Sequence, residues 1–332
     1  MFQGNGNVYL ATEVRRLSGR SPNDLCNYSS QQEHAPPMSN KVDSSESQAI
    51  EDEIATLERK LQDAKGRLNA GRSNGTAILD RPSKVKLDPL AASSHHFLLL
   101  LADSALPLGS FAFSNGLESY LAHTRPNSSF PAFLNLSLSS YASTTLPFVL
   151  AAHRNPIDLV ELDDTLDAAI MCTVGRRASV AQGRALLSIW DRSFSSALPL
   201  GASAVAVQAL KEFTILLRST SSTLASDLPA ASAHLGPLFG AIACILGMSL
   251  EQTAYVFMLS HVKALLSAAV RASMFGPYHA QKVLASVEVQ EEIHKVIEKE
   301  WKTKIEDVGQ SVPVMDLWVG RHEMLYSRIF NS

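Results

Sequence analysis

The side chains that usually carry catalysis or bind metals are scattered along this chain. It has ten histidines and three cysteines, but the only adjacent pair is His95 and His96, and no CxxC or HExxH spacing occurs. A nucleotide-binding P-loop needs a lysine after its glycines, because the lysine reaches the phosphates. Gly71–Thr76 has the glycines without the lysine. The sequence therefore predicts no catalytic residue, no cofactor and no local metal cluster, although distant residues or a dimer could still assemble a metal site.

Two polar residues stand out because their surroundings are apolar. Arg271 is the only fixed charge between Lys263 and Lys282, and a buried guanidinium needs a carboxylate or several carbonyl partners. We expect it to pair inside the protein with Asp103 or Glu118, with a contact to a partner protein as the alternative.

His234 opens a segment without fixed charges. We expect it to be a hydrogen-bonded histidine at the start of a helix. A contact to a partner or to a metal is the alternative interpretation.

An apolar loop precedes one predicted helix. Ordinary loops are polar because they run over the surface, whereas this one carries Leu106, Phe111 and Phe113 around Pro107 and Gly109. Proline and glycine fix its backbone. The loop is expected either to pack into its own core or to bind another protein.

A cap is predicted where this loop meets the following helix. Either Ser114 or Asn115 has a side chain suited to the N-cap position, and Glu118 would complete a capping box with Asn115.

The last twenty residues, Pro313–Ser332, combine aromatic and arginine side chains. Trp318, Leu325, Ile329 and Phe330 would form an apolar stripe beside polar residues on a helix. Interface hot spots are enriched in tryptophan, tyrosine and arginine. We therefore expect a docking tail, with packing against the chain itself as the alternative. The residues that we expect to form partner-binding surfaces are Leu106, Pro107, Phe111, Phe113, Glu118, Arg271, Trp318, Arg321, His322, Arg328 and Phe330.

The elements that position these residues are predicted to be helices. No convincing alternation of β-branched residues appears, and prolines fall near the junctions of helical patterns. The fold class is therefore all-α, a single bundle of about ten helices over residues 95–332. The expected helices are Ser93–Ala102, Asn115–His123, Phe130–His153, Ile157–Cys172, Val174–Arg192, Leu200–Ser219, Ala233–Leu246, Leu250–Phe275, Tyr278–Ile305 and Met315–Ile329.

Residues 1–94 are expected to be an extension that is disordered apart from one short helix. The first forty residues are rich in Ser, Asn, Gln, Gly and Pro. Residues 47–69 then carry apolar side chains at alternating spacings of four and three, which is a heptad seam. Its members are Ile50, Ile54, Leu57, Leu61, Ala64 and Leu68. Because the pattern lasts under three heptads, the helix should pair with a partner or the bundle, or fray.

The segment His234–Gln281 is apolar enough to suggest a membrane span. A spanning helix needs about 20 uninterrupted apolar residues, and Pro237, Glu251 and Lys263 interrupt the pattern. Gly240, Cys244 and Gly247 share one helical face, where small residues let helices approach closely. We therefore expect core helices rather than a membrane protein.

Composition narrows the partners and the compartment. The net charge is −3, with 18% charged residues against about a quarter in a typical protein, and no basic patch with aromatic residues suggests nucleic acid. Cys26, Cys172 and Cys244 are few and far apart, which favours a reducing compartment. With no apolar signal core near Met1, the expected location is the cytoplasm.

Five blocks in this order resemble the UreF family of urease accessory proteins in its fungal or plant form. They are LADSALPLGSFAFSNGLESY, the run RRASVAQG from Arg176, HLGPLFGAIACILGMSLEQT, SAAVRASMFGPYHAQ and the tail Pro313–Ser332. The resemblance covers Phe97–Ser332. Phe113 and Asn115 depart from residues that are common in bacterial members.

The resemblance implies an all-α homodimer without enzymatic activity of its own. Such a scaffold would bind the D/H-type urease accessory protein through its C-terminal tail and then recruit the G-type GTPase. Together they would deliver nickel into apo-urease, so that the complex handles the metal.

Two other functions stay open at this point. One is a GTPase-activating-like regulator of the G-type partner that would use Arg271, Arg321 or Arg328. The other is a helical enzyme with a pocket in the bundle, for which the residues offer no acid–base or nucleophile arrangement.

Overall fold

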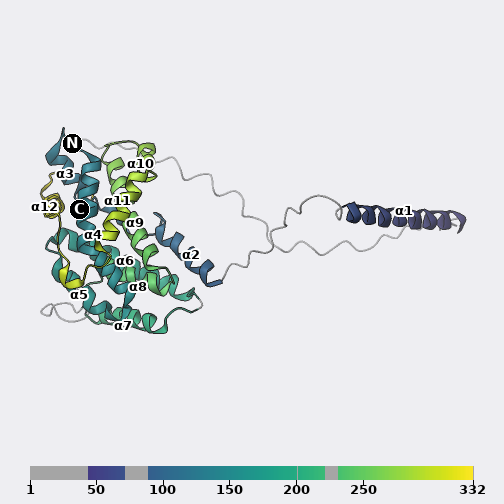
Figure 1. Cartoon of the computed structure of the whole chain (residues 1–332), viewed down its shortest axis with the longest axis horizontal. Helices are drawn as coiled ribbons and strands as arrows, with labels where there is room; N and C mark the ends of the chain where they lie inside the picture. Colours follow the sequence, from purple (N-terminus) through teal and green to yellow (C-terminus); the bar gives the residue numbers. More distant parts are fainter. Residues whose placement is uncertain (1–43, 72–88, 200, 221–230, 332) are drawn as a thin grey trace, which may run out of the picture. The chain divides into compact units, whose positions relative to one another are not determined.

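The computed structural model describes residues 44–71, 89–199, 201–220 and 231–331, and the chain divides into two units, Met1–Ser83 and Lys84–Ser332 (Figure 1). Helix α1 (Ser44–Gly71) is the described part of the first unit. The second unit holds helices α2 to α12. Over all the described residues the secondary structure is helical without a strand, so the predicted all-α class is confirmed.

Helix α1 confirms the helix predicted from the heptad pattern and is slightly longer than residues 47–69. Its seam residues Ile54, Leu57 and Leu61 are each more than half exposed. The side chains of Ile50 and Leu68 lie outside the described residues, as does Cys26.

The second unit packs its helices around one hydrophobic core. Its first helix starts at Pro89, ahead of residue 95 where the bundle was expected to begin, and buries Phe97 and Leu101. The helices are α2 (Pro89–Ala102), α3 (Leu117–Thr124), α4 (Phe130–Arg154), α5 (Leu159–Ala169), α6 (Thr173–Arg192), α7 (Ala204–Thr220), α8 (Leu235–Ile245), α9 (Leu250–Arg271), α10 (Pro277–Leu284), α11 (Val287–Glu300) and α12 (Val314–Arg321).

Helix α4 runs through the centre and packs against α8, α9 and α11. Its N-cap residue is Ser129, whose hydroxyl accepts a hydrogen bond from the Ala132 amide, and it accommodates Pro147 within its length. Gly240 of α8 lies so close to α4 that a Cβ there would come within 2.1 Å of the Val149 carbonyl oxygen. The small residue therefore sets the distance between the two central helices, as its position in the sequence predicted.

Helix α9 is the only helix in the described part of the chain that is long and apolar enough to cross a membrane. However, 61% of its most apolar window is buried inside the protein. A capping box of Ser249 and Gln252 starts the helix, with hydrogen bonds of 3.1 and 2.9 Å. Its apolar residues thus contribute to the bundle core, as expected from the sequence.

Two predicted helices have the wrong extent. Tyr278–Ile305 is divided into α10 and α11, because the Ser286 hydroxyl accepts the Val289 amide and starts a new helix. Met315–Ile329 stops at Arg321, because a 3₁₀ turn, His322–Met324, follows and the backbone is extended at Leu325. The amides of Ile329 and Phe330 then bond to the Glu118 side chain rather than to helix carbonyls.

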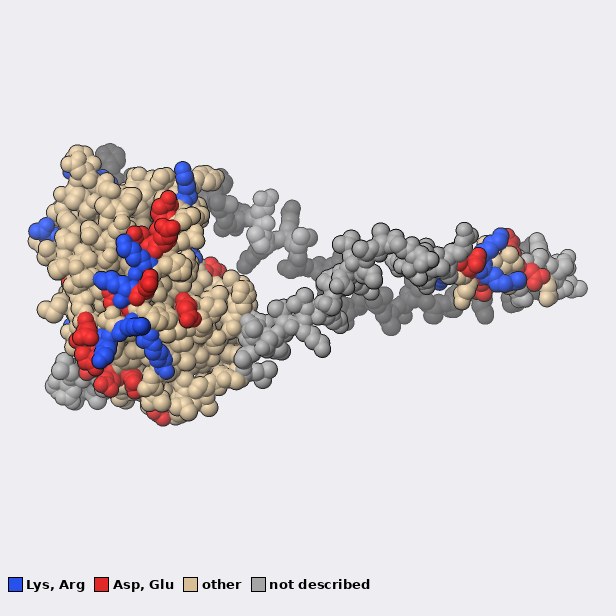
Figure 2. All heavy atoms as spheres, in the orientation of Figure 1, with Lys and Arg blue, Asp and Glu red and all other residues tan. Residues whose placement is uncertain are grey.

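The visible face of the second unit is mostly uncharged, with acidic and basic side chains gathered beside one another (Figure 2). This agrees with the low charged fraction of the sequence.

Candidate functional site

The apolar loop and the C-terminal tail meet in the second unit, although about 200 residues separate them. They form what we call the loop–tail surface, which consists of Phe111, Glu118, Arg271, His322, Ile329 and Phe330. The loop contributes the 3₁₀ turn Ser110–Ala112, α3 contributes Glu118, and the end of α9 contributes Arg271. The Asn331 amide donates to the Ala112 carbonyl oxygen over 2.8 Å, which ties the end of the tail to the loop.

Glu118 holds the tail in place. One carboxylate oxygen accepts from the Ile329 amide at 2.7 Å, and the other bonds to His322 Nε2 at 2.8 Å and accepts from the Phe330 amide at 3.3 Å. His322 is completely buried, and its Nδ1 has no hydrogen-bond partner among the described residues. A single carboxylate therefore fixes both ends of the segment from His322 to Phe330.

The capping box predicted for Asn115 and Glu118 is wrong, because the Glu118 carboxylate bonds to the tail instead. Asn115 has a positive φ of 50° and Gly116, with φ 84°, is the N-cap residue of α3. The Ser114 hydroxyl accepts the Glu118 amide at 3.4 Å, so the other candidate contributes to this turn. The Glu118 carboxylate is thereby free to reach the tail.

Arg271 links the loop to the tail, and no carboxylate of the described residues pairs with it. Its guanidinium lies 4.3 Å from the centre of the Phe330 ring and donates to the Phe111 carbonyl oxygen. The expected pairing with Asp103 or Glu118 is therefore wrong, because a carbonyl and an aromatic face take that place. Partial burial lowers the pKa of Arg271 from its ordinary value.

Trp318 on α12 packs the start of the tail against α3. Its ring makes an edge contact with Tyr120 at 5.7 Å and a tilted contact with His123 at 5.8 Å. A Cβ at Gly116 would approach the Trp318 Cβ to 3.0 Å, so glycine permits this packing. The predicted single stripe is divided, because Trp318 and Phe330 pack inward whereas Ile329 faces outward.

The loop–tail surface leaves apolar side chains in contact with solvent. Phe111 is 64% exposed and Ile329 is 65% exposed, although Phe330 beside it is buried. Of the other predicted interface residues, Pro107, Arg321 and Arg328 are exposed, while Leu106 and Phe113 are partly buried. The structure thus brings five of the eleven predicted residues together in this surface, and its hydrogen-bonded backbone presents Phe111 and Ile329 to solvent.

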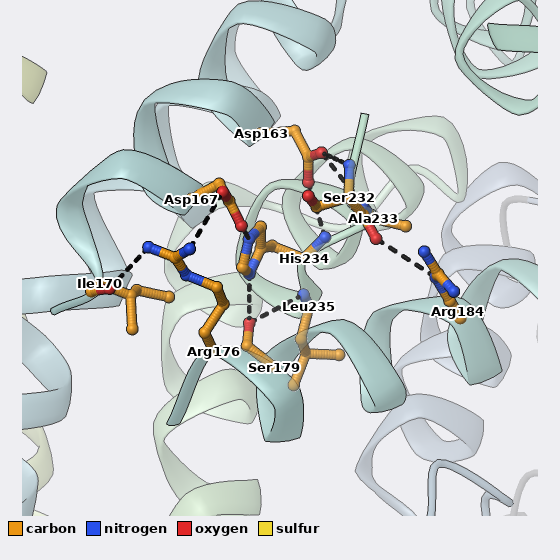
Figure 3. A network of polar contacts seen from close by, with 10 residues as sticks. All are labelled: Asp163, Asp167, Ile170, Arg176, Ser179, Arg184, Ser232, Ala233, His234 and Leu235. Atoms are coloured by element: carbon orange, nitrogen blue, oxygen red, sulfur yellow. Dashed lines mark hydrogen bonds and ion pairs between the residues drawn. The ribbon is translucent and has the colours of Figure 1, made fainter. Parts of the chain in front are cut away.

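A second polar network joins α5, α6 and the start of α8 (Figure 3). The buried Asp163 carboxylate accepts the amides of Ser232, Ala233 and His234 at 2.7, 3.0 and 2.6 Å. His234 is completely buried, as a hydrogen-bonded histidine at a helix start, which confirms that prediction.

The His234 ring bridges two neighbouring helices. Its Nε2 lies 2.9 Å from Asp167 Oδ1 and its Nδ1 lies 3.0 Å from the Ser179 hydroxyl (Figure 3). Although this is the order of a carboxylate–imidazole–serine relay, Ser179 lies inside helix α6 and also accepts the Leu235 amide at 3.3 Å. These bonds attach α8 to α5 and α6. The sequence signal for the network was the spacing of four between Asp163 and Asp167, which sequence reasoning missed.

A cavity of about 200 Å³ lies between α4, α6, α9 and the segment before α12, and Leu108 and Ser110 of the loop reach it. Ser137 bonds to His261 Nε2 at 2.9 Å, and Tyr141 stacks on the His261 ring at 4.1 Å. Burial lowers the pKa of His261 to about 3, so this imidazole is neutral near pH 7. Burial also raises the pKa of Tyr141. The polar groups around this neutral ring are hydroxyls, and elsewhere the cavity is lined by amide side chains and by the carboxylate of Asp316.

Among the residues that the structure describes, no group of three histidine, cysteine, aspartate or glutamate side chains is placed to hold a metal ion.

Comparison with known proteins finds relatives that belong to one family. A family model described as UreF matches residues 125–288. A protein of Schizosaccharomyces pombe named "Uncharacterized urease accessory protein UreF-like" is 37% identical, over 71% of this chain and 97% of its own length. Urease accessory protein F of Oryza sativa subsp. indica is 32% identical, over 69% of this chain and 82% of its own length. Urease accessory protein UreF of Paenarthrobacter aurescens is 31% identical, over 73% of this chain and its full length.

Proposed function

Because this chain belongs to the UreF family of urease accessory proteins, we propose that it is a non-enzymatic scaffold for nickel insertion into apo-urease. In this role a homodimer of the bundle binds the D/H-type urease accessory protein and recruits the G-type GTPase in the cytoplasm. The GTPase supplies GTP hydrolysis, and nickel is the cargo of the assembled complex.

The observation that carries this proposal is the loop–tail surface. Glu118 and Arg271 hold the tail against the loop, and the exposed side chains of Phe111 and Ile329 stand on this fixed backbone. Apolar side chains in a fixed conformation are favourable for binding, because little conformational entropy is lost when a partner covers them. The surface is therefore our candidate for the contact with the D/H-type protein.

A pair of charge insertions tests this docking site. Phe111→Arg and Ile329→Arg each place a charge where the proposal expects a desolvated contact, which is costly unless the charge is paired. Ile215→Arg is the matched control, because Ile215 on α7 is 65% exposed. We expect the first two variants to bind the purified D/H-type protein at least about tenfold more weakly in calorimetry, whereas the control binds normally.

The fold of each variant is checked by circular dichroism. Normal binding by both Phe111→Arg and Ile329→Arg would exclude the loop–tail surface as the docking site. Loss of helicity in Phe111→Arg would instead make the loop part of the core. Removing Pro313–Ser332 is a less specific test, since it also takes away the buried Met315.

Regulation of the G-type GTPase is the second candidate function. Arg321 and Arg328 are exposed, as a contact to a partner's nucleotide site requires, whereas Arg271 is engaged by Phe111 and Phe330. Arginine fingers depend on the forked guanidinium. Under this alternative Arg321→Lys or Arg328→Lys abolishes stimulation of GTP hydrolysis but preserves the complex, and unchanged hydrolysis rates would refute it.

A further inference from the structure

Helix α1 carries an apolar seam that nothing in its own unit covers over the described residues. Ile54, Leu57 and Leu61 lie on one side of the helix and are 51%, 58% and 55% exposed. Among the described side chains of the helix, the hydrogen bonds are local, from Thr56 to Asp52 and from Arg59 to Ala55. In proteins, most of the stability of a helix comes from packing of its apolar face rather than from helix propensity. Its stability therefore depends on an occupant for the seam.

The heptad numbering identifies the residues that flank the seam. With Ile54 and Leu61 at position a, and Leu57 and Ala64 at position d, the flanking e and g positions hold Glu53, Glu58, Lys60 and Lys65. The two acidic residues come first and the two basic residues follow. Acidic and basic side chains both appear along α1 in Figure 2. The helix thus has an acidic first half and a basic second half beside its seam.

This order of charges opposes a parallel pair of α1 helices. In a parallel pair, each g position faces the e position of the next heptad on the other helix. Glu53 would face Glu58 of the second copy, and Lys60 would face Lys65. Both contacts bring together like charges, which destabilise helix pairs.

An antiparallel pair brings opposite charges together at most of the positions beside the seam. When the pair is centred on Arg59, Ile54 lies opposite Ala64 of the second copy and Leu57 lies opposite Leu61. By heptad position in the sequence, this register pairs Glu51 with Lys65 and Glu53 with Arg67, on both sides of the centre. Glu58 and Lys60, next to the axis, meet their own copies, so two contacts between like charges remain beside four between opposite charges.

We propose that α1 is a self-association helix, which pairs in antiparallel orientation with α1 of a second copy of this chain. The seam is then covered by α1 of the second copy, because the order of charges along the helix pairs opposite charges only when the two helices run in opposite directions. This contact is separate from the dimer of the bundle and does not depend on the proposed role in urease maturation.

Disulfide cross-linking of the full chain tests the orientation. The three native cysteines are first replaced by serine, and chains with Ile54→Cys are mixed with chains carrying Ala64→Cys. We expect linked dimers mainly in the mixture. Ala55→Cys mixed with Asp63→Cys is the matched control, because these positions face away from the seam at nearly the same spacing. Little linking is expected in the control.

Reversal of one charge gives a second test, because it changes the yield of linked dimers in opposite directions for an antiparallel and a parallel pair. Lys65→Glu places a carboxylate opposite Glu51 in the antiparallel pair, so the cross-linked fraction should fall, by about fivefold for two such contacts. In a parallel pair the same change would face Lys60 and increase linking. Adding Glu51→Lys to Lys65→Glu should restore the original yield.

Three results would overturn the proposal. Linking of Ile54→Cys chains with one another would indicate a parallel pair. Equal linking of the outward-facing control would indicate no defined seam. Absence of linked dimers, with the seam protected inside a single chain, would show that α1 packs on its own bundle.

Discussion

Replacing Glu118 with alanine should release the C-terminal tail and leave the bundle folded. The substitution removes the acceptor for His322 and for the amides of Ile329 and Phe330. Hydrogen bonds to a charged group contribute about 1.5–3 kcal/mol each, but the two amides can bond to water once the tail is free. His322 would lose the partner of a completely buried ring.

The expected loss is therefore about 3 kcal/mol in the free energy of tail docking, which corresponds to about a hundredfold. Hydrogen exchange by NMR measures this directly, since protection of the Ile329 and Phe330 amides should fall by that factor. Glu323→Ala is the matched control. Its ion pair with Arg177 lies at the surface, and such pairs contribute at most about 1 kcal/mol.

Unchanged protection of these two amides in Glu118→Ala would refute the assignment of Glu118 as the group that holds the tail. Equal loss of protection within α4 would show instead that Glu118 supports the whole bundle. An equal effect of Glu323→Ala would indicate that any charge near the tail has this role.

Three further predictions concern the bundle. Gly240→Ala should destabilise it by about 3 kcal/mol or more in urea unfolding, because the new Cβ would collide with the Val149 carbonyl, whereas Gly276→Ala, which meets open space, should change little. Burial lowers the pKa of His261 to about 3 from 6.5, so the unfolded chain binds a proton that the folded chain does not. Stability should therefore fall by about 2 kcal/mol from pH 7 to pH 5, and His261→Gln should reduce that slope; an unchanged slope would contradict this assignment. Deleting Met1–Ser83 should leave the thermal unfolding of the bundle and the activation of urease unchanged, and loss of either would show that the first unit is needed.

The partners of single charged residues were harder to predict than the helices. Arg271 needed a partner, and the sequence offered Asp103 and Glu118 as carboxylates. In the structure the carbonyl of Phe111 and the ring of Phe330 serve instead. Every residue has a carbonyl, so a sequence pattern does not single out which one a guanidinium will reach.

The role of Glu118 shows the same difficulty. Its spacing from Asn115 fits a capping box, which is a local motif. The structure uses the carboxylate for a contact more than 200 residues away in sequence. A local sequence pattern predicts partners that are near in sequence. A distant segment that offers several hydrogen-bond donors can bind the same side chain instead.

The sequence by itself determined the helical class, the close approach at Gly240, the buried start of α8 at His234 and the resemblance to UreF, because these depend on periodicity, residue size and motif order. Only the tertiary structure decided that the tail meets the apolar loop, that Glu118 and Arg271 hold it there, and that Phe111 and Ile329 face solvent. These contacts join segments far apart in the chain, and their geometry depends on how all the intervening helices pack.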